Sequence, residues 1–281
     1  MDSLVSTDWL ARHLGEAGLV VLDASAHLPD AKRDARAEFA AGHIPGARFL
    51  DLSSLTDPDS PVPAAVPTGA QFAERMARLG VNDGDRVVIY DHSAVKTSAR
   101  AWFIARMHGV AEVAILDGGL GKWRAEGRPL EAGEPGLSAG SFTASAGAGT
   151  VRFKSDVLAN LGSRREQLVD ARGRARFSGT EADFRPNIAS GHIPGSCNLP
   201  YSLLFQHDGT FLRPGNLKAA FEQAGIDLHE PVVTTCGGGV TAAVLLFALH
   251  LLGKDDVALY DGSWSEWGAD PATPKATGAA A

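Results

Sequence analysis

Short runs of β-branched and aliphatic residues alternate along the chain with segments whose apolar residues recur every three or four positions. The first pattern predicts buried strands and the second predicts helices with one apolar face. Their alternation is typical of an α/β fold, a parallel sheet flanked by helices. The predicted strands are 19–23, 48–50, 86–91 and 113–117 in the first half and 167–170, 196–199, 232–236 and 257–260 in the second.

One predicted helix has recognisable signals at both ends. Thr68 and Gln71 have the spacing of a capping box, in which each side chain satisfies a backbone N–H at the start of a helix. Gly80 follows as a typical C-terminal stop. A strongly apolar helix is expected from about 240 to 252. The residues after 270 are expected to fray, because they are rich in Pro, Ala, Thr and Gly.

Four motifs occur twice in the same order, at offsets that stay between 144 and 149 positions. Chance matches do not keep such a register, so the sequence predicts a tandem duplication. The predicted domains are 1–130 and 151–281, joined by a linker at 131–150 that is rich in Gly, Ala, Ser and Pro. The motif pairs are Leu22-Asp23-Ala24 and Val169-Asp170-Ala171, Gly42-His43-Ile44-Pro45-Gly46 and Gly191-His192-Ile193-Pro194-Gly195, Val87-Val88-Ile89-Tyr90-Asp91 and Val232-Val233-Thr234-Thr235-Cys236, and Asp117-Gly118-Gly119 and Asp261-Gly262-Ser263.

Composition narrows the class of protein. The chain of 281 residues is 44% hydrophobic and 21% charged, which is ordinary for a globular protein with two cores. A net charge of −7 without a basic run argues against a nucleic-acid partner. No stretch approaches the ~20 apolar residues of a membrane helix, and the N-terminus lacks the pattern of a secretory signal. We therefore expect a cytoplasmic protein whose two cysteines are reduced.

The copies differ where chemistry would lie, because Asp91 in the first corresponds to Cys236 in the second. Cys236 ends a predicted strand and precedes a glycine-rich turn and a helix start. Such a turn can point successive backbone N–H groups inward, and the helix adds its positive end. A sulfur in this cradle would be a good nucleophile, and the cradle would also hold a terminal persulfide sulfur. The loop consists of Gly237, Gly238, Gly239, Val240 and Thr241.

Other interpretations of the cysteines fit less well. A lone cysteine is usually a small buried hydrophobe, which is what we expect of Cys197. Cysteine phosphatases need an Arg six positions after the nucleophile, where this chain has Ala242. No Cys or His pair has metal-ligand spacing, so no metal is predicted. Sulfur transfer through a cysteine would need no organic cofactor either.

Several motifs together resemble the rhodanese superfamily, and specifically its two-domain sulfurtransferases. The most specific are Asp170-Ala171-Arg172, the paired His-Ile-Pro-Gly segments, the loop from Cys236 to Thr241 and the segment 260–267. The resemblance covers nearly the whole chain. It implies two tandem rhodanese-like domains, each a parallel sheet flanked by helices. It also implies that the first is a catalytically inactive copy and the second carries the sulfur-accepting cysteine.

Within that superfamily the chain looks like the mercaptopyruvate type. Thiosulfate enzymes typically carry basic residues after the cysteine, whereas the three loop glycines here are uncharged. Arg176 and Arg185, nine positions apart, resemble the pair that holds the donor's carboxylate and ketone oxygen in mercaptopyruvate enzymes. Gly238 departs from that type, which has a serine at this position.

The expected reaction moves sulfur from 3-mercaptopyruvate to Cys236 and then to an acceptor, which could be a small thiol, thioredoxin or cyanide. A relay through His43, with Asp34 as its orienting acid, is one further hypothesis; the alternative is that His43 and His192 stabilise equivalent turns. Two rival functions remain open. One is a thiosulfate:cyanide sulfurtransferase, and the other is a persulfide carrier or docking module without efficient turnover.

Overall fold

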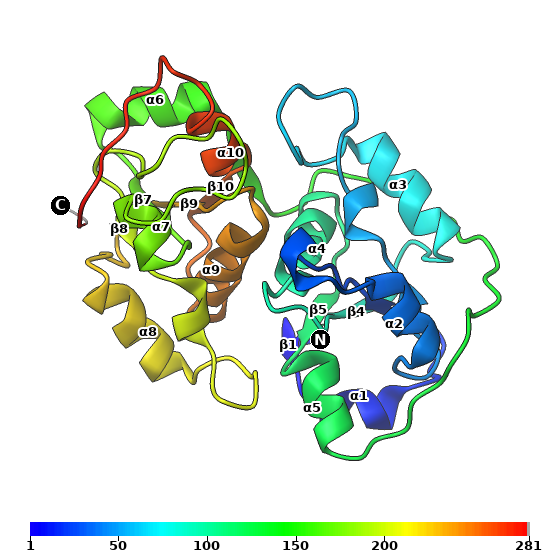
Figure 1. Cartoon of the computed structure of the whole chain (residues 1–281). Coiled ribbons are helices and arrows are strands. Elements are labelled where there is room, and N and C mark those ends of the chain that lie inside the picture. Colours follow the sequence, from blue (N-terminus) through cyan, green and yellow to red (C-terminus); the bar gives the residue numbers. More distant parts are fainter. Residues whose placement is uncertain (280–281) are drawn as a thin grey trace. The chain divides into compact units, whose positions relative to one another are not determined.

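The structure, a computed structural model, describes residues 1–279 and divides the chain into two compact units (Figure 1). The first unit comprises Met1–Pro58, Val66–Gly149 and Phe205–Phe211. The second comprises Asp59–Ala65, Thr150–Leu204 and the chain from Leu212 onward. Each half of the sequence therefore contributes one short segment to the unit that is built mainly from the other half.

The first unit has a five-stranded parallel sheet in the order β1-β5-β4-β2-β3. Its strands are β1 (Leu4–Val5), β2 (Leu19–Asp23), β3 (Arg48–Phe49), β4 (Arg86–Tyr90) and β5 (Val113–Leu116). Its helices are α1 (Thr7–His13), α2 (Ala35–Ala41), α3 (Gly69–Arg78), α4 (Ser98–Met107) and α5 (Gly119–Ala125), with short 3₁₀ turns at Pro29–Ala31 and Leu52–Ser54.

The second unit repeats this topology. Its parallel sheet has the order β6-β10-β9-β7-β8, which matches the first sheet strand for strand. The strands are β6 (Thr150–Arg152), β7 (Gln167–Asp170), β8 (Cys197–Asn198), β9 (Val232–Thr235) and β10 (Val257–Tyr260). The helices are α6 (Lys154–Ser163), α7 (Arg174–Ser178), α8 (Pro214–Gln223), α9 (Val240–Leu251) and α10 (Ser263–Trp267), with a 3₁₀ turn at Tyr201–Leu204. The predicted fold class is confirmed.

All eight predicted strands are present, and β2, β7 and β10 have the predicted bounds. The predicted capping box is confirmed: the Gln71 amide N–H donates to Thr68 Oγ1 at 3.3 Å, and the Thr68 N–H donates to Gln71 Oε1 at 2.9 Å. The edge strands β1 and β6 were not predicted: two or three residues show no period, and unlike the equally short β3 and β8 they do not follow a duplicated His-Ile-Pro-Gly motif.

The prediction that the chain frays after 270 is wrong for the part of the tail that the structure describes. The Trp267 indole N–H donates to the Pro274 carbonyl at 2.8 Å, and the Thr273 hydroxyl donates to the Trp267 carbonyl at 2.6 Å. Ala276 forms an antiparallel bridge with His192. Local composition does not reveal such contacts, since they depend on which side chains meet in the folded chain and, for Ala276, on backbone far away in the sequence.

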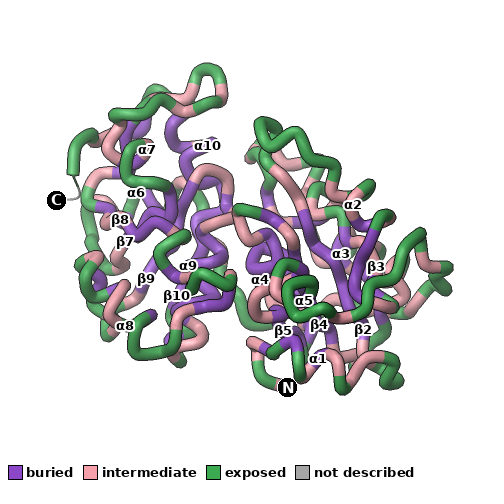
Figure 2. Tube along the Cα trace, turned by 60° about the horizontal axis from the view of Figure 1, so that its bottom comes forward, coloured by how far each residue is buried: buried purple, intermediate pink, exposed green. Residues whose placement is uncertain are grey.

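The helix that follows each central strand is almost completely buried (Figure 2). In α4 the residues from Ser98 to Ala105 are buried, and in α9 those from Ala242 to Leu249. α4 packs on β4 and β5, and α9 packs on β9 and β10. A helix that is apolar all round is stable only in such a position. Within the described residues, no helix is long and apolar enough to cross a membrane.

The segment Phe205–Phe211 is fixed in the first unit by polar and aromatic contacts. The Phe211 amide donates to Asp117 Oδ1 at 2.8 Å, and Lys122 pairs with Asp208 at 3.1 Å. The Lys96 ammonium lies 4.9 Å from the centre of the Phe205 ring. Burial raises the pKa of Asp117 to about 6; the Phe211 amide opposes this rise, Asp208 adds to it, and Lys122 and Lys96 lower it.

Replacing Asp117 by Asn should stabilise the protein at pH 8. A pKa raised to about 6 means that the carboxyl stabilises the folded state below its unfolded pKa, near 4, and that this contribution is lost as pH rises through about 6. Asn keeps the acceptor for Phe211 without the buried charge. The expected gain at pH 8 is roughly 1–2 kcal/mol, discounted for partial exposure, and it should shrink towards pH 4.5. Denaturant unfolding at the two pH values measures it.

Asp208→Asn is the matched control, with the opposite sign. Hydrogen bonds from Thr210, with help from Lys122, lower the pKa of Asp208 to about 2. Its carboxylate therefore stabilises the folded state above pH 4, and its removal should cost stability at pH 8. Equal effects of the two substitutions would contradict the assignment of Asp117 as a destabilising buried charge.

Candidate active site

Cys236 lies at the carboxyl end of the central strand β9, directly before the loop that leads into α9. Its side chain is buried, with 2% of the residue exposed. Gly239 caps the helix in the left-handed region with φ 80°, where a side chain would be strained. The chain therefore turns sharply between the cysteine and the helix start, as the glycine-rich sequence predicts.

The segment after β10 holds this loop through three hydrogen bonds. The Cys236 amide donates to Ser263 Oγ at 3.2 Å, the Trp264 amide donates to the Cys236 carbonyl at 3.0 Å, and the Ser265 amide donates to the Gly237 carbonyl at 2.8 Å. Within residues 1–279, no backbone or side-chain acceptor takes the amides of Gly237, Gly238 and Gly239. The Cys236 and Gly237 carbonyls are thus fixed, while the glycine amides of the loop remain available to an anion.

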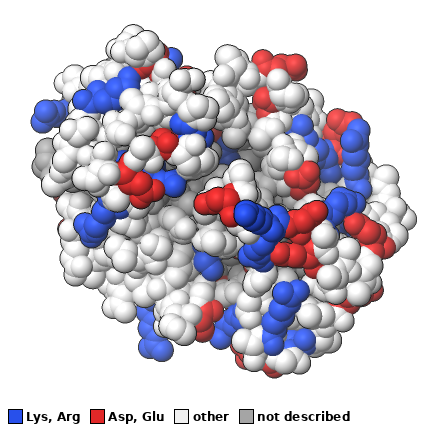
Figure 3. Space-filling model, viewed as in Figure 1, with Lys and Arg blue, Asp and Glu red and all other residues white. Residues whose placement is uncertain are grey.

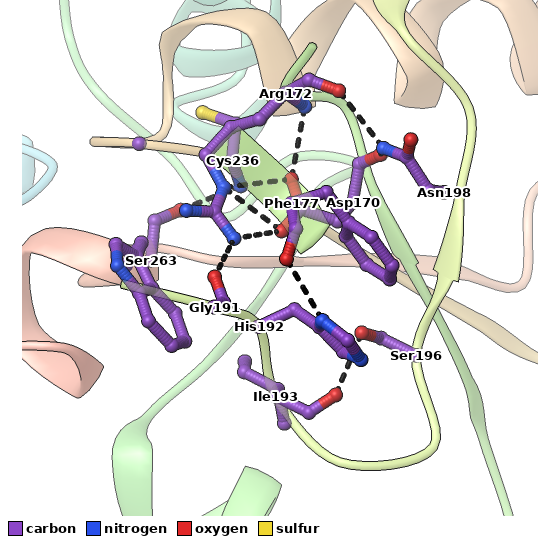
Figure 4. A network of polar contacts seen from close by, with 12 residues as sticks. Asp170, Arg172, Phe177, Gly191, His192, Ile193, Ser196, Asn198, Cys236 and Ser263 are labelled. Carbon is purple, nitrogen blue, oxygen red and sulfur yellow. Dashed lines mark hydrogen bonds and ion pairs between the residues drawn. The ribbon is translucent and has the colours of Figure 1, made fainter. Parts of the chain in front are cut away.

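A buried ion pair lies behind the loop. Asp170, at the end of β7, is paired in register with Thr235, the residue before Cys236. Figure 4 shows the Arg172 guanidinium facing the Asp170 carboxylate and the Gly191 carbonyl. Arg172 Nη2 donates to Asp170 Oδ2 at 2.7 Å and to the Gly191 carbonyl at 2.8 Å, and its Cζ lies 4.6 Å from the centre of the Trp264 ring. One cation therefore joins β7, the turn before β8 and the segment that holds the cysteine loop.

The structure places Arg185 at the loop. Its Nη1 donates to the Gly237 carbonyl at 3.0 Å, and its Nε and Nη2 donate to Asp183 at 2.8 and 2.7 Å. Burial opposes ionisation of Asp183, but the hydrogen bonds from Arg185 outweigh it, so the pKa of this carboxyl lies below its ordinary value. A guanidinium held in this way is a fixed positive charge beside the cysteine loop.

Arg176 is linked to Arg185 through the ring of Phe184. Its Nε donates to Glu181 at 2.9 Å, and its Cζ lies 4.9 Å from the centre of the Phe184 ring. The same ring lies 5.4 Å from Arg185 Cζ. The two predicted arginines therefore contact one aromatic side chain, although they come from α7 and from the loop that follows it.

His43 and His192 have matching environments. In each case Nδ1 bonds a backbone carbonyl at 2.8 Å, that of Phe39 or Phe177, and the imidazole stacks on the same phenylalanine. These contacts fit the turn-stabilising alternative. Asp34 caps α2 by accepting from the amides of Arg36 and Ala37. No hydrogen bond joins Asp34 to His43 within the described chain, and the relay through His43 stays a prediction.

Cys197 has a different environment from Cys236. Burial raises the pKa of the Cys197 thiol, and its Sγ lies 3.9 Å from the Gly225 carbonyl oxygen. Both cysteines are free thiols. Among the described residues, no group of three or more His, Cys, Asp or Glu could hold a metal ion.

Sequence reasoning did not assign roles to four residues around the loop: Asp183, Phe184, Ser263 and Trp264. For the last two a signal was present, since their segment recurs in the first copy as Gly119-Leu120. There the Leu120 amide donates to the Asp91 carbonyl at 3.1 Å, as the Trp264 amide does to Cys236. Asp183 and Phe184 lie on an irregular loop without a repeat to mark them.

The equivalent loop of the first copy is filled by its own side chain. Asp91 Oδ1 accepts from the Ser93 amide and Oδ2 accepts from the Ser98 amide, both at 2.9 Å. The Asp91 carboxylate thus accepts one amide of its own loop and the first amide of α4. The second copy has Cys236 at this position instead of a carboxylate. An anion bound by its loop amides would therefore be the cysteine sulfur or part of a ligand.

A duplicated parallel α/β unit, with one buried cysteine at the carboxyl end of a central strand and a glycine loop behind it, defines a tandem-domain sulfurtransferase. Comparison with known proteins supports this assignment to the tandem-domain sulfurtransferases. The family model for the rhodanese-like domain matches residues 6–126 and 154–270. The chain belongs to the rhodanese family and is a sulfurtransferase.

Several curated relatives match over most of their length. The 3-mercaptopyruvate sulfurtransferase of Homo sapiens is 41% identical, with 94% of this chain and 91% of that protein covered. The enzyme of the same name from Escherichia coli is 39% identical, with 94% of each chain covered. A thiosulfate sulfurtransferase from Gallus gallus is 40% identical, over 94% and 93%. The fold matches SseA from Escherichia coli, described as a 3-mercaptopyruvate sulfotransferase, with a TM-score of 0.85, 37% identity and coverage of 95% and 100%.

Arg172→Ala should strongly destabilise the second unit. It leaves the Asp170 carboxylate, whose side chain is 1% exposed, without its partner. Breaking a buried pair in this way typically costs about 3–5 kcal/mol. Arg172→Lys should cost less, because it keeps the charge and loses the forked geometry. Denaturant unfolding followed by tryptophan fluorescence gives both values.

Arg174→Ala is the matched control, since Arg174 is exposed two positions further on. Its effect should stay within about 0.5 kcal/mol. A loss below about 1 kcal/mol for Arg172→Ala would show that Asp170 finds another partner and that the pair does not support the loop.

Proposed function

We propose that this sulfurtransferase takes sulfur from 3-mercaptopyruvate, holds it as a persulfide on Cys236 and passes it to a thiol or to cyanide. The observation that carries the choice of donor is the position of Arg185. Its guanidinium lies against the Gly237 carbonyl, while the loop itself has no charged side chain. Positive charge is therefore available at one side of the cysteine, where the carboxylate of a 2-oxo acid would bind.

The first step is attack of the Cys236 thiolate on the sulfur of the donor. The new S–S bond forms as the donor's C–S bond breaks, and the electron pair of that bond passes to the pyruvate enolate. The proton lost by the donor's thiol balances the enolate, so the products are pyruvate and Cys236–S–S⁻. Arg185 and Arg176 face the carboxylate and the carbonyl oxygen, where negative charge develops.

The persulfide anion is then held by the loop amides from Gly237 to Thr241. Successive N–H groups at the start of a helix form an anion site, and α9 is twelve residues long. The glycine amides, which have no acceptor among the described residues, are the expected donors to the terminal sulfur.

In the second step an acceptor attacks the outer sulfur and the Cys236 thiolate leaves. A small thiol or reduced thioredoxin would become a persulfide, and cyanide would become thiocyanate. The electrons balance in both half-reactions without a metal or an organic cofactor. The acceptor and a cytoplasmic location stay predictions from the sequence.

The first domain, 1–130, has no sulfur chemistry in this proposal, and 131–150 joins it to the catalytic domain, 151–281. Asp91 supports this, because its carboxylate accepts the amides of Ser93 and Ser98 at the position that Cys236 has in the second copy. A carboxylate cannot accept sulfur, and it keeps other anions away from these amides.

Thiosulfate is the second candidate donor. The Gallus gallus relative named thiosulfate sulfurtransferase is about as similar as the mercaptopyruvate enzymes, and Arg185 could face a sulfonate oxygen as well as a carboxylate. The glycine loop favours mercaptopyruvate, since a dianionic donor gains more from charge placed directly beside the sulfur. A persulfide carrier without efficient turnover would load but discharge slowly.

The mass of the protein after mixing with a donor tests the proposal. We expect a gain of one sulfur with 3-mercaptopyruvate, lost again on adding a reducing thiol and absent in Cys236→Ser. Cys197→Ser is the matched control and should load normally. Loading of Cys236→Ser would overturn the assignment of the nucleophile, and rapid loading from thiosulfate alone would establish the second donor.

Arg185→Lys should separate the two donors. Lys keeps the charge but cannot hold a carboxylate through two parallel hydrogen bonds. Loss of one charge-assisted hydrogen bond of about 2 kcal/mol lowers kcat/KM for 3-mercaptopyruvate roughly 30-fold. The effect on thiosulfate should be several times smaller. Steady-state rates with each donor and cyanide give the comparison.

Arg185→Ala would also cost stability, because it leaves the nearly buried carboxylate of Asp183 without its partner. The double variant Asp183→Asn/Arg185→Ala removes that cost and isolates the effect on the donor. Equal losses for both donors in this pair of variants would show that Arg185 supports the loop and does not select the carboxylate.

A further inference from the structure

Phe184 is a large apolar side chain that stays 57% exposed beside the cysteine loop. It follows Asp183 and precedes Arg185, both of which have fixed polar contacts. A single exposed phenylalanine needs no explanation in general. This one differs because its ring is in contact with the two guanidinium groups that the proposed function uses.

The two distances are 4.9 Å from Arg176 Cζ and 5.4 Å from Arg185 Cζ to the ring centre. Both lie within the ~6 Å over which a cation is attracted to the negative face of an aromatic ring. Two guanidinium groups would otherwise repel each other. The ring attracts both and so stabilises an arrangement that has two positive charges on one side of the loop.

The acidic partners alone do not bring the arginines together. Arg176 pairs with Glu181, whose side chain is 54% exposed, while Arg185 pairs with Asp183, which is 3% exposed. The first pair lies towards water and contributes little to a fixed geometry. The Phe184 ring is the described side chain that contacts both guanidinium groups. It therefore ties Arg176, whose acidic partner is exposed, to Arg185, which donates to the Gly237 carbonyl.

We propose that Phe184 is a positioning residue for the donor: its ring holds Arg176 and Arg185 at the separation that grips the carboxylate and carbonyl of a 2-oxo acid. This role rests on the proposed function. It predicts an effect on donor binding and none on the chemistry at sulfur, because the ring contacts the guanidinium groups that would bind the donor. The affected quantity is KM for 3-mercaptopyruvate at nearly constant kcat.

Phe184→Leu and Phe184→Tyr test this role. Leu keeps the apolar bulk and loses the aromatic face, whereas Tyr keeps the face. We expect Phe184→Leu to raise KM for 3-mercaptopyruvate roughly fivefold, the effect of losing two exposed cation–π contacts, with kcat changed less than twofold. Phe184→Tyr should remain within about twofold of the unsubstituted protein in both constants. Phe153→Leu is the matched control, since Phe153 is 62% exposed and lies directly before α6.

A direct readout of the contact comes from the arginine Nε–Hε signals in NMR spectra. The signals of Arg176 and Arg185, assigned through Arg176→Lys and Arg185→Lys, should shift in Phe184→Leu and stay in place in Phe184→Tyr. A merely structural ring would change unfolding stability in both variants without this pattern.

The outcomes distinguish a failure of the proposed function from a failure of the positioning role of Phe184. If the unsubstituted protein gains no sulfur from 3-mercaptopyruvate, the proposed function is overturned and this role with it. If it loads normally and Phe184→Leu leaves KM unchanged, the positioning role alone is overturned. If Phe184→Leu leaves loading unchanged but slows discharge to reduced thioredoxin, the ring contacts the acceptor and the positioning role is likewise overturned.

Discussion

Arg172 and Asp170 form an ion pair inside the second unit, where their side chains are 6% and 1% exposed. The charges of this pair are compensated by three kinds of contact: the forked hydrogen bonds between them, the Gly191 carbonyl and the Trp264 ring. Trp264 in turn donates its amide to the Cys236 carbonyl. Desolvating two charges is costly, so such a pair adds little net stability but strongly restricts geometry. Its consequence here is that the end of β7, the turn before β8 and the cysteine loop are held in one arrangement.

The first copy has the same strand order without this ion pair. Asp23 occupies the position of Asp170, but Ser25 replaces Arg172. Burial raises the pKa of Asp23, and the hydrogen bonds from Ser25 only partly oppose the rise. At the next strand Asp91 accepts two amides of its own loop. Both copies therefore keep the backbone topology, while the added Arg and Cys are confined to the second.

On the face shown in Figure 3, acidic and basic side chains lie interspersed, so the charged groups on this face act mainly through pairs of neighbouring side chains.

Much of this could be predicted from the sequence because the fold repeats local signals. Buried parallel strands are continuous apolar runs, and eight of the ten strands in the described chain were found, whereas β1 and β6 have neither a visible period nor a duplicated motif before them. The cysteine loop is also local, so its glycines indicated the turn. The exchange of Phe205–Phe211 and Asp59–Ala65 between the units could not be predicted, because a loop's composition does not say which sheet it packs against. The contacts of Asp183 and Phe184 depend on tertiary structure in the same way.

The separation of charge from the nucleophile has a chemical consequence in the proposed reaction. The loop that would hold the persulfide contributes neutral amides, and the positive charge comes from Arg185, which is anchored on the Gly237 carbonyl. Amide dipoles stabilise an anion without forming a full ion pair, so the outer sulfur stays reactive towards an incoming acceptor. A lysine or arginine in the loop would bind the persulfide more tightly and make it a poorer donor of sulfur. In the proposed reaction the positive charge would instead face the part of the substrate that leaves as pyruvate. In the proposed reaction, donor recognition and sulfur release could therefore change independently, since residues 176–185 would determine the first and the glycine loop the second.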